Sequence, residues 1–378
     1  MNQLIPYVSA CKINASAYIW VAGNGKRNHI AEMTDLQSPP TLDDVAAIAR
    51  VSTATVSRCI NDPEMVSKPT RERVDAAIKQ LGYTPNFAAR SMAAKRTFTI
   101  GAIVPTMENA FFAQGLQAFQ EEIHAHRYTL LVSSSAYDPI AEEDQIRTLV
   151  ARGADGILLI GHDRDPAIYD YLDRQRVPSL VAWSYDESAQ APSVGFDNRA
   201  AMRAMAESAI AMGHQHIGMI SAYSAKNDRA RMRVEGVKDA MKSNGLDPSS
   251  LALVETTYSV ANGTAAFVGL MGQSPRPSLI LCGNDVFAAG ALRGARQLGL
   301  SVPEDVSVTG FDDLEIAQVV NPELTTVHVP HRAMGQASAR ELVKMIEEKR
   351  AGVSQKLDVQ LVHRGSVAAP KPHSRKSS

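Results

Sequence analysis

The sequence predicts a small all-α head followed by a larger α/β core of parallel, doubly wound sheets arranged in two lobes. Three observations support this fold class. Apolar residues recur at helical spacing in three short segments between residues 40 and 83. From residue 97 onward, short apolar runs alternate with amphipathic stretches about every 30 residues, which is typical of βαβ units. The chain of 378 residues also exceeds the roughly 100–200 residues of one domain.

The head should contain three short helices. Its first apolar stripe covers residues 42–49, the second covers 56–60, and the third covers 74–81 and ends at Gly82. Thr41 can cap the first of these helices, because a threonine hydroxyl accepts a hydrogen bond from a backbone N–H in the first turn. Three such helices can enclose one small core.

The first two helices should be joined by a tight turn. The first should stop near Arg50, and Ser52 can then cap a second, polar helix over residues 53–60. This is the helix-turn-helix design, which places its second helix in the major groove of DNA. Arg58 on the outer face can make a bidentate contact to guanine, worth about 1–3 kcal/mol of discrimination.

The other polar residues of the head divide into two groups. Thr53 and Ala54, at the start of the second helix, are candidates for reading base edges. Thr41, Ser57 and Asn61 are better suited to phosphate oxygens, which position a protein on DNA without specifying sequence. The alternative interpretation is that these hydroxyls only cap helices and that the arginine is solvated.

The core should alternate strands and helices. The predicted strands are 100–104, 129–132, 156–160, 179–182, 217–220, 279–281 and 306–308. The predicted helices are about 109–125, 141–152, 199–213, 230–244, 262–273 and 285–298. Ligands of such folds bind beyond the carboxyl ends of the strands. Candidate ligand positions are therefore residues 105–112, Trp183, Asn284-Asp285 and Asp312-Asp313.

Charge is distributed unevenly along the chain. The net charge is −1, but residues 1–96 hold 12 Lys/Arg and 8 Asp/Glu, and the rest of the chain holds 27 and 32. A basic head on an acidic body favours a nucleic-acid module at the head. The three cysteines form neither a CxxC zinc pattern nor an even disulfide framework.

Motifs of enzymes and metal sites are missing from the sequence. It has no P-loop, no GxSxG elbow, no HExxH, and no GxGxxG after a strand, so we expect no enzyme and no cofactor. The segment Gly213-His-Gln-His216 is more typical of a helix end than of a metal site, and we expect no bound metal.

The two ends of the chain carry no apolar pattern. Residues 1–39 are either a disordered extension or a stretch before a translation start at Met33, and residues 368–378 are expected to be a disordered tail. No apolar run approaches a transmembrane helix, and the start lacks a signal peptide, so we expect a cytoplasmic protein without a membrane partner.

A long, spaced motif connects the head to a known family. Residues 41–58 read Thr-Leu-x-Asp-Val-Ala-x-x-Ala-x-Val-Ser-x-x-Thr-Val-Ser-Arg, and Leu81-Gly-Tyr83 and Pro85-Asn86 continue the pattern. The segment resembles the headpiece of the lactose/galactose repressor family, and the similarity continues to about residue 367. One departure is Arg50, where many members have glycine; a left-handed residue other than glycine costs about 1 kcal/mol there.

The resemblance implies a repressor that binds double-stranded DNA. The helix-turn-helix would cover residues 40–84, and residues 85–96 would be a hinge helix that orders on DNA, although a plain linker is the alternative. Two hinges would pair and insert Met92 into the minor groove, which implies a homodimer, possibly a higher oligomer, on a near-palindromic operator. Arg96 would meet phosphates. The residues expected to bind DNA are Thr41, Ser52, Thr53, Ala54, Thr55, Ser57, Arg58, Asn61, Asn86, Ala89, Arg90 and Met92.

The resemblance also implies a core similar to periplasmic sugar-binding proteins. The N-lobe would comprise about 97–196 and 327–350, and the C-lobe about 197–326 and 351–367. A small effector, namely a sugar, a sugar acid or a related metabolite, would bind between the lobes, held by polar groups and an aromatic platform. The residues expected to bind it are Phe111, Phe112, Trp183, Asp197, Asn227, Arg233, Tyr258, Asn284 and Asp312. The alternative is that the acidic residues cap helices and the aromatic residues fill the core.

Other functions remain open at this stage. A solute-binding protein of the same fold is disfavoured by the DNA-binding head and the missing export signal. A metabolic enzyme on a doubly wound scaffold would be distinguished by turnover, and a repressor whose cleft binds a protein by co-purification. The sequence does not indicate whether the effector releases the protein from DNA or promotes its binding to DNA.

Overall fold

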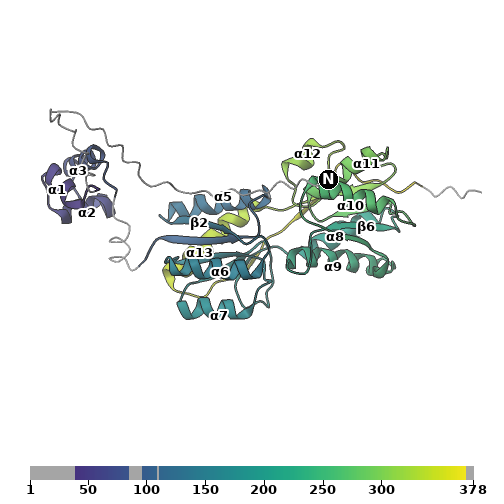
Figure 1. Ribbon diagram of the computed structural model, residues 1–378, viewed down its shortest axis with the longest axis horizontal. Coiled ribbons are helices and arrows are strands. Elements are labelled where there is room, and N and C mark those ends of the chain that lie inside the picture. Colours follow the sequence, from purple (N-terminus) through teal and green to yellow (C-terminus); the bar gives the residue numbers. More distant parts are fainter. Residues whose placement is uncertain (1–38, 85–95, 109, 372–378) are drawn as a thin grey trace, which may run out of the picture. The chain divides into compact units, whose positions relative to one another are not determined.

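The computed structural model describes residues 39–84, 96–108 and 110–371 of the chain (Figure 1). Contacts divide the chain into two units that meet in sequence at Pro85. The predicted extension before residue 39 and hinge residues 85–95, which include Asn86, Ala89, Arg90 and Met92, lie outside the described residues, as do residues 372–378.

The first unit is the predicted helical head. Its described elements are α1 (Leu42–Ala49), α2 (Thr53–Asn61), the 3-10 turn η1 (Pro63–Met65) and α3 (Lys68–Leu81). Val45, Val56 and Val74, one from each α-helix, are fully buried and form the centre of one small core. The three predicted helices are confirmed, and α3 begins earlier than its apolar stripe because its first turn is polar and contains Pro69, which suits a helix start.

The N-lobe of the second unit is built on a six-stranded parallel sheet with the order β11-β5-β4-β3-β1-β2. Its strands are β1 (Thr99–Val104), β2 (Thr129–Ser134), β3 (Gly156–Ile160), β4 (Ser179–Ala182), β5 (Ser193–Gly195) and β11 (Gln355–Lys356). Side chains of a strand alternate between faces, so Leu158 and Ile160 of β3 pack on one side while Ile157 and Leu159 pack on the other. Helices α5 (Ala110–Ala125) and α13 (His331–Glu348) cover the first face, and α6 (Pro139–Ala151) and α7 (Pro166–Gln175) cover the second (Figure 1).

The C-lobe repeats this plan on a four-stranded parallel sheet with the order β7-β6-β8-β9. Its strands are β6 (Ile217–Ser221), β7 (Ala252–Glu255), β8 (Leu279–Cys282) and β9 (Ser307–Thr309). On β8, Leu279 and Leu281 face α8 (Asn198–Ile210) and α9 (Asp228–Ser243), whereas Ile280 and Cys282 face α10 (Val260–Met271) and α11 (Asp285–Gln297). The short elements η2 (Pro248–Ser250) and α12 (Glu315–Val319) complete the lobe.

The chain passes between the lobes near its end. Strands β10 (Thr326–His328) and β12 (Gln360–Val362) pair antiparallel, and between them the chain enters the N-lobe as α13. There α13 packs closely on α5, because Gly335 has no side chain: a Cβ at this position would clash with the backbone of Gly115.

Most of the predicted core elements are confirmed within a few residues. The sequence did not indicate β5, β7, β10, β11 and β12, nor α7, α12 and α13. The missed strands have two to four residues each, too few for an alternating pattern to stand out. In α13, by contrast, Met334, Leu342 and Ile346 do form an apolar stripe.

The structure corrects two predicted boundaries and one predicted contact. Strand β11 pairs with β5, so residues 355–356 belong to the N-lobe sheet and not to the C-lobe. Arg96, predicted to meet DNA phosphates, donates from Nη2 to the carbonyl oxygen of Ile346 at 2.9 Å, in the last turn of α13, where a cation is favoured by the helix dipole. The C-terminal tail starts later than predicted, because the carbonyl oxygen of Ala368 accepts a hydrogen bond from the Ser307 hydroxyl at 3.0 Å.

None of the helices in the described residues is long and apolar enough to cross a membrane.

Candidate functional site

In the head, side-chain caps fix the first turns of both α1 and α2. Thr41 and Asp44 form a capping box: the backbone N–H of Asp44 donates to the Thr41 hydroxyl, and the backbone N–H of Thr41 donates to the Asp44 carboxylate at 2.8 Å. The Thr41 hydroxyl also donates to the Asp44 carboxylate at 2.7 Å. This hydrogen bond, followed by the one from the backbone N–H of Thr41, lowers the pKa of Asp44. Ser52 caps α2 by accepting the backbone N–H of Thr55 at 3.2 Å, and the two hydroxyls lie 2.9 Å apart. The predicted capping roles are confirmed.

The turn between α1 and α2 carries the strain that the sequence predicted. Arg50 stands at the C-cap of α1 with φ 52° and ψ 51°, in the left-handed region. The backbone N–H of Val51 bonds back to the carbonyl of Ala46 at 3.1 Å, which closes the turn. Arginine therefore occupies a position that favours glycine.

The outward face of α2 is small and polar. Ala54 and Arg58 are exposed, and Thr53, Ser57 and Asn61 are half-buried at the edges of this face. The amide of Asn61 donates to the Ser57 hydroxyl at 3.2 Å, so these two side chains hold each other in place. A helix with short side chains can approach the floor of a groove closely, and the long Arg58 can reach a base edge.

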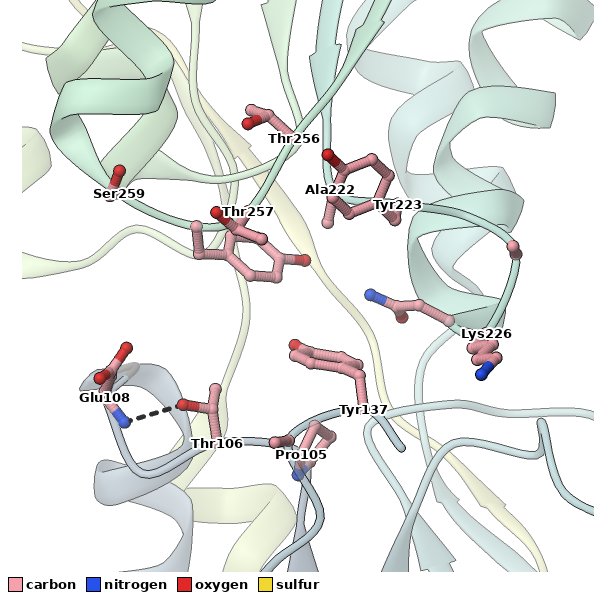
Figure 2. A pocket seen from close by; sticks show the side chains of 14 residues that line it. Pro105, Thr106, Glu108, Tyr137, Ala222, Tyr223, Lys226, Thr256, Thr257 and Ser259 are labelled. Atoms are coloured by element: carbon pink, nitrogen blue, oxygen red, sulfur yellow. Dashed lines mark hydrogen bonds between the residues drawn. The ribbon is translucent and has the colours of Figure 1, made fainter. Parts of the chain in front are cut away.

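The second unit contains a cleft of about 670 Å³ between its lobes (Figure 2). Its walls are the loops that follow four strands: β1 and β2 from the N-lobe, and β6 and β7 from the C-lobe. The lining residues are Pro105, Thr106, Glu108, Ala136, Tyr137, Ala222, Tyr223, Ala225, Lys226, Asn227, Thr256, Thr257, Tyr258 and Ser259. The cleft therefore lies where ligands of doubly wound sheets bind, beyond the carboxyl ends of parallel strands.

Two tyrosines dominate the cleft. Tyr137 extends into it from the N-lobe (Figure 2). Tyr258 lines it from the C-lobe, and the centroids of the two rings lie 6.4 Å apart. Tyr258 stacks on Phe287 at 5.0 Å, which fixes its ring. Tyr137 and the preceding Ala136 both have positive φ, 61° and 52°, so a strained turn presents this ring to the cleft.

Of the predicted effector residues, Asn227 and Tyr258 line the cleft directly. Asn227 also caps α9 by accepting the backbone N–H of Ala230 at 3.3 Å. Its side chain is 3% exposed, so its position is fixed by the fold.

Arg233, Asn284 and Asp312 lie together in a buried layer that we call the cleft floor, which also contains His331. The Arg233 guanidinium lies 3.7 Å over the ring of Phe311, and its Nη2 lies 3.7 Å from Oδ1 of Asp312. Asn284 caps α11 by accepting the backbone N–H of Phe287 at 2.9 Å. The floor lies next to the cleft, because the ring of Phe111 lies 6.0 Å from that of His331 in the floor and 6.4 Å from that of Tyr258 in the cleft lining. Burial raises the pKa of Tyr258, and Arg233 acts in the opposite direction.

Burial dominates the electrostatics of the floor. It raises the pKa of Asp312 to about 7, although Arg233 acts in the opposite direction. Asp312 also has φ 101°, a backbone conformation that side chains rarely adopt. Such strain at a buried carboxylate is typical of a functional site.

Three predicted effector residues pack in the core or cap a helix, and these structural roles account for their positions without a ligand. Phe112 is 1% exposed and packs against Phe111 and Trp183, because its face of α5 points into the N-lobe core. Trp183 is likewise in the core and does not line the cleft. Asp197 caps α8 by accepting the backbone N–H of Ala200 at 2.9 Å and lies 3.7 Å from Lys356. Phe111 takes an intermediate place: it is buried, but its ring lies 6.4 Å from that of Tyr258.

Sequence reasoning missed Tyr137 and His331. Tyr137 follows β2, so the rule that ligands bind after parallel strands could have found it. His331 begins α13 and is 3% exposed; its Nδ1 accepts a hydrogen bond from the indole N–H of Trp183 at 3.2 Å, and its Nε2 lies 3.9 Å from Oδ1 of Asp312. Burial and then Arg233 lower the pKa of His331 to about 3. No local pattern marks this histidine, because its partners come from distant parts of the chain.

Polar contacts also bridge the lobes beside the cleft. Nη1 of Arg231 on α9 donates to Asp163, after β3, at 2.7 Å. Asp228 accepts the backbone N–H of His162 at 2.9 Å. Although burial acts against it, the neighbouring Arg229 lowers the pKa of Asp228. These contacts connect the two lobes through ionised groups.

The described residues contain no group of three or more metal-ligating side chains arranged to hold a metal ion. His214, from the Gly-His-Gln-His segment, is buried with Nδ1 2.9 Å from the Ser278 hydroxyl and Nε2 2.9 Å from the carbonyl oxygen of Ala368. His214 therefore connects the C-terminal segment at Ala368 to the C-lobe through hydrogen bonds.

Comparison with known proteins gives matches for both units. Residues 41–86 match the family described as "Bacterial regulatory proteins, lacI family", and residues 206–367 match the "Periplasmic binding protein-like domain". The chain is 32% identical over 324 residues to catabolite control protein A of Priestia megaterium, which covers 86% of this chain and 97% of that protein. It is 32% identical over 332 residues to the HTH-type transcriptional repressor PurR of Klebsiella pneumoniae, with coverages of 87% and 97%.

Solved structures agree with these matches. The structure of the lac repressor dimer bound to operator and the anti-inducer ONPF superposes with a TM-score of 0.78 at 28% identity, over 88% of this chain and 100% of that chain. A complex of the transcriptional regulator CelR with cellobiose superposes with a TM-score of 0.64 at 29% identity, over 86% and 99%.

Proposed function

Because the chain belongs to the lacI family of bacterial regulatory proteins, we propose that it is a dimeric transcriptional repressor whose operator affinity is set by a small effector bound in the cleft. The observation that carries this proposal is the presence, in one chain, of a capped polar helix α2 and a cleft between two lobes. A solute-binding protein would need only the second of these features.

On the operator, α2 lies in the major groove. Arg58 reads guanine, Thr53 and Ala54 read neighbouring base edges, and Ser57 with Asn61 contacts the phosphate backbone. The capping box of α1 adds Thr41 at the groove edge. Ser52 and Thr55 hold the start of α2 in the same place. The minor-groove contacts predicted for Asn86, Ala89, Arg90 and Met92 remain predictions.

In the cleft, the effector is a sugar or a related metabolite. The lining supports this, because aromatic faces at Tyr137 and Tyr258 stand next to polar side chains such as Asn227. The related regulator CelR was solved with cellobiose. We propose further that the protein has no enzymatic activity, as its relatives are transcription regulators, and that it acts in the cytoplasm, where operator DNA is found.

The mechanism is a linkage between the two sites. The effector changes the relative position of the lobes, to which the bridges Arg231–Asp163 and Asp228–His162 contribute. In a dimer this changes the spacing of the paired heads. Operator affinity shifts by the difference in effector affinity between the two states, typically about 1–3 kcal/mol.

Selection of binding sites from random duplex DNA tests the proposal. The full-length protein should enrich one near-palindromic sequence, with the spacing of a symmetric dimer. The Arg58→Ala variant serves as the control and should lose the enrichment. If the wild-type protein enriches no sequence, alone or with sugars present, the proposed function is wrong.

A further inference from the structure

The cleft floor holds polar atoms without hydrogen-bond partners in the protein. These are Nδ2 of Asn284, Oδ2 of Asp312 and Nε2 of His331. Their residues are 0%, 2% and 3% exposed. A buried polar group without a partner costs about 1–3 kcal/mol. Three of them lie in one layer and come from three separate elements, which makes them candidates for bonding a ligand.

The protonation of His331 is fixed by its neighbour. The indole N–H of Trp183 can only donate, so Nδ1 of His331 must be the acceptor in their 3.2 Å hydrogen bond. The proton of the neutral ring then lies on Nε2, the atom without a partner. Trp183 is itself held in place, because its carbonyl oxygen accepts a hydrogen bond from the Asn198 amide at 3.1 Å. The floor therefore offers a neutral N–H donor at a fixed position.

Formal charges around the cleft are balanced. Arg233 faces Asp312 at 3.7 Å, and Arg229 is paired with Asp228 at 2.8 Å. At the rim, Glu108 and Lys226 are the charged residues that line the cleft, one of each sign. Each buried guanidinium beside the cleft thus has its own carboxylate, and an anionic ligand would find no uncompensated cation.

We propose that the cleft selects an uncharged, hydroxyl-bearing ligand over the carboxylate form of the same ligand, with His331 as the specificity-determining donor and Trp183 as the residue that positions it. This inference rests on the proposed function. It narrows the expected effector class, because it excludes sugar acids.

The donors and acceptors of the floor match a hydroxyl group. A hydroxyl can accept from Nδ2 of Asn284 or Nε2 of His331 and donate its own proton to Asp312. Above the pKa of Asp312, about 7, this side chain is a carboxylate. A ligand carboxylate has no proton to donate to it, and the two negative charges would repel each other in the buried layer. The rings of Tyr137 and Tyr258, both in the cleft lining, provide flat faces on which the C–H side of a sugar ring can pack.

Matched ligand pairs test the selectivity in the full-length protein. Calorimetric titrations with cellobiose and cellobionate, ribose and ribonate, and glucose and gluconate compare each neutral sugar with its acid. In every pair that binds, we expect the neutral member to bind at least about tenfold more tightly. If an acid binds as tightly as its neutral partner or more tightly, this inference is wrong while the proposed function stands. If none of the six compounds binds, the sugar-binding function itself fails, and the inference fails with it.

Charge and donor variants identify the residues responsible. Asp312→Asn leaves Arg233 without a counter-charge. The affinity for the acid, relative to the affinity for its neutral partner, should therefore rise by about tenfold or more. Asp313→Asn is the matched control, because the carboxylate of Asp313 is held by Arg364 at 2.7 Å and His328 at 3.0 Å, and selectivity should stay unchanged. Equal effects of the two variants would contradict the assignment.

The role of Trp183 has a spectroscopic readout that a purely structural role would not move. Nitrogen NMR of wild-type protein should show His331 with an unprotonated Nδ1 and a protonated Nε2. Trp183→Phe keeps a buried ring but removes the donor, so the histidine should become a mixture of tautomers, and the preference for neutral sugars should weaken. Circular dichroism and operator binding check that the variant is folded. A mixture of tautomers in the wild-type protein, or an unchanged single tautomer in folded Trp183→Phe, would overturn the positioning role.

Discussion

The head and the cleft floor recognise their partners in opposite ways. In the head, Ala54 and Arg58 are exposed on one short helix, and under the proposed function neighbours in sequence form the surface that reads DNA. In the floor, Arg233, Asp312 and His331 are almost fully buried and come from separate elements that meet only in the fold. Recognition of a long, accessible DNA groove needs side chains that protrude. Recognition of a small ligand needs groups fixed in advance, where water is excluded.

The largest effect should follow from removing the floor's carboxylate. Asp312→Ala removes the acceptor proposed for the effector hydroxyl and leaves Arg233 buried without its counter-charge. A hydrogen bond to a charged group contributes about 1.5–3 kcal/mol, so effector affinity should fall roughly ten- to a hundredfold or more. Operator binding should persist but no longer respond to effector, as gel shifts with and without ligand will show. Asp197→Ala is the control: its carboxylate caps α8 at the surface, and effector affinity should not change. A larger loss of effector affinity in Asp197→Ala than in Asp312→Ala would mean that Asp197, and not Asp312, contacts the effector.

A second substitution tests the exposed surface of α2 in the head. Arg58→Ala should weaken specific operator binding by about 1–3 kcal/mol, roughly ten- to a hundredfold, because a bidentate contact to guanine is lost. Effector affinity should be unchanged. Arg73→Ala removes the same charge from the exposed surface of α3 and should cost less. Fluorescence anisotropy with operator and scrambled duplexes separates specific from non-specific loss. If Arg58→Ala also abolished effector binding, Arg58 would be structural.

The smallest effect concerns stability of the head alone. Arg50→Gly should raise the free energy of unfolding of the head by about 1 kcal/mol, because glycine adopts the left-handed conformation at no steric cost. Arg73→Gly, the same substitution inside α3, should lower it by about 1 kcal/mol, because glycine is a poor helix former. Hydrogen exchange of the head amides measures both. If both variants changed the free energy of unfolding in the same direction, that result would contradict the argument from backbone conformation.

The same difference explains what could be predicted from sequence. The head was predictable in detail, down to the caps at Thr41 and Ser52 and the strained turn at Arg50, because these features depend on residues at most a few positions apart. Of the core, the alternation of strands and helices and the position of the cleft were predictable, because both follow from the βαβ pattern.

The residues inside the cleft were only partly predictable. Arg233, Asn284 and Asp312 were found through a family pattern, which cannot show that they lie in a buried layer below the tyrosines. Trp183 was assigned to the ligand, but its indole N–H is used by His331, which is 148 positions away in sequence. Such long-range partners are brought together by the packing of α13 on the N-lobe sheet, and no local pattern encodes them.

The central claim is that the cleft and the operator-binding helix are coupled within one protein. Titration of the full-length dimer with its selected operator, at one fixed salt concentration and with increasing amounts of a neutral sugar that binds the cleft, tests this claim most directly. The account predicts that operator affinity changes by about 5- to 150-fold and that operator DNA changes the sugar affinity by the same factor. An operator affinity that is identical with and without saturating sugar would contradict it.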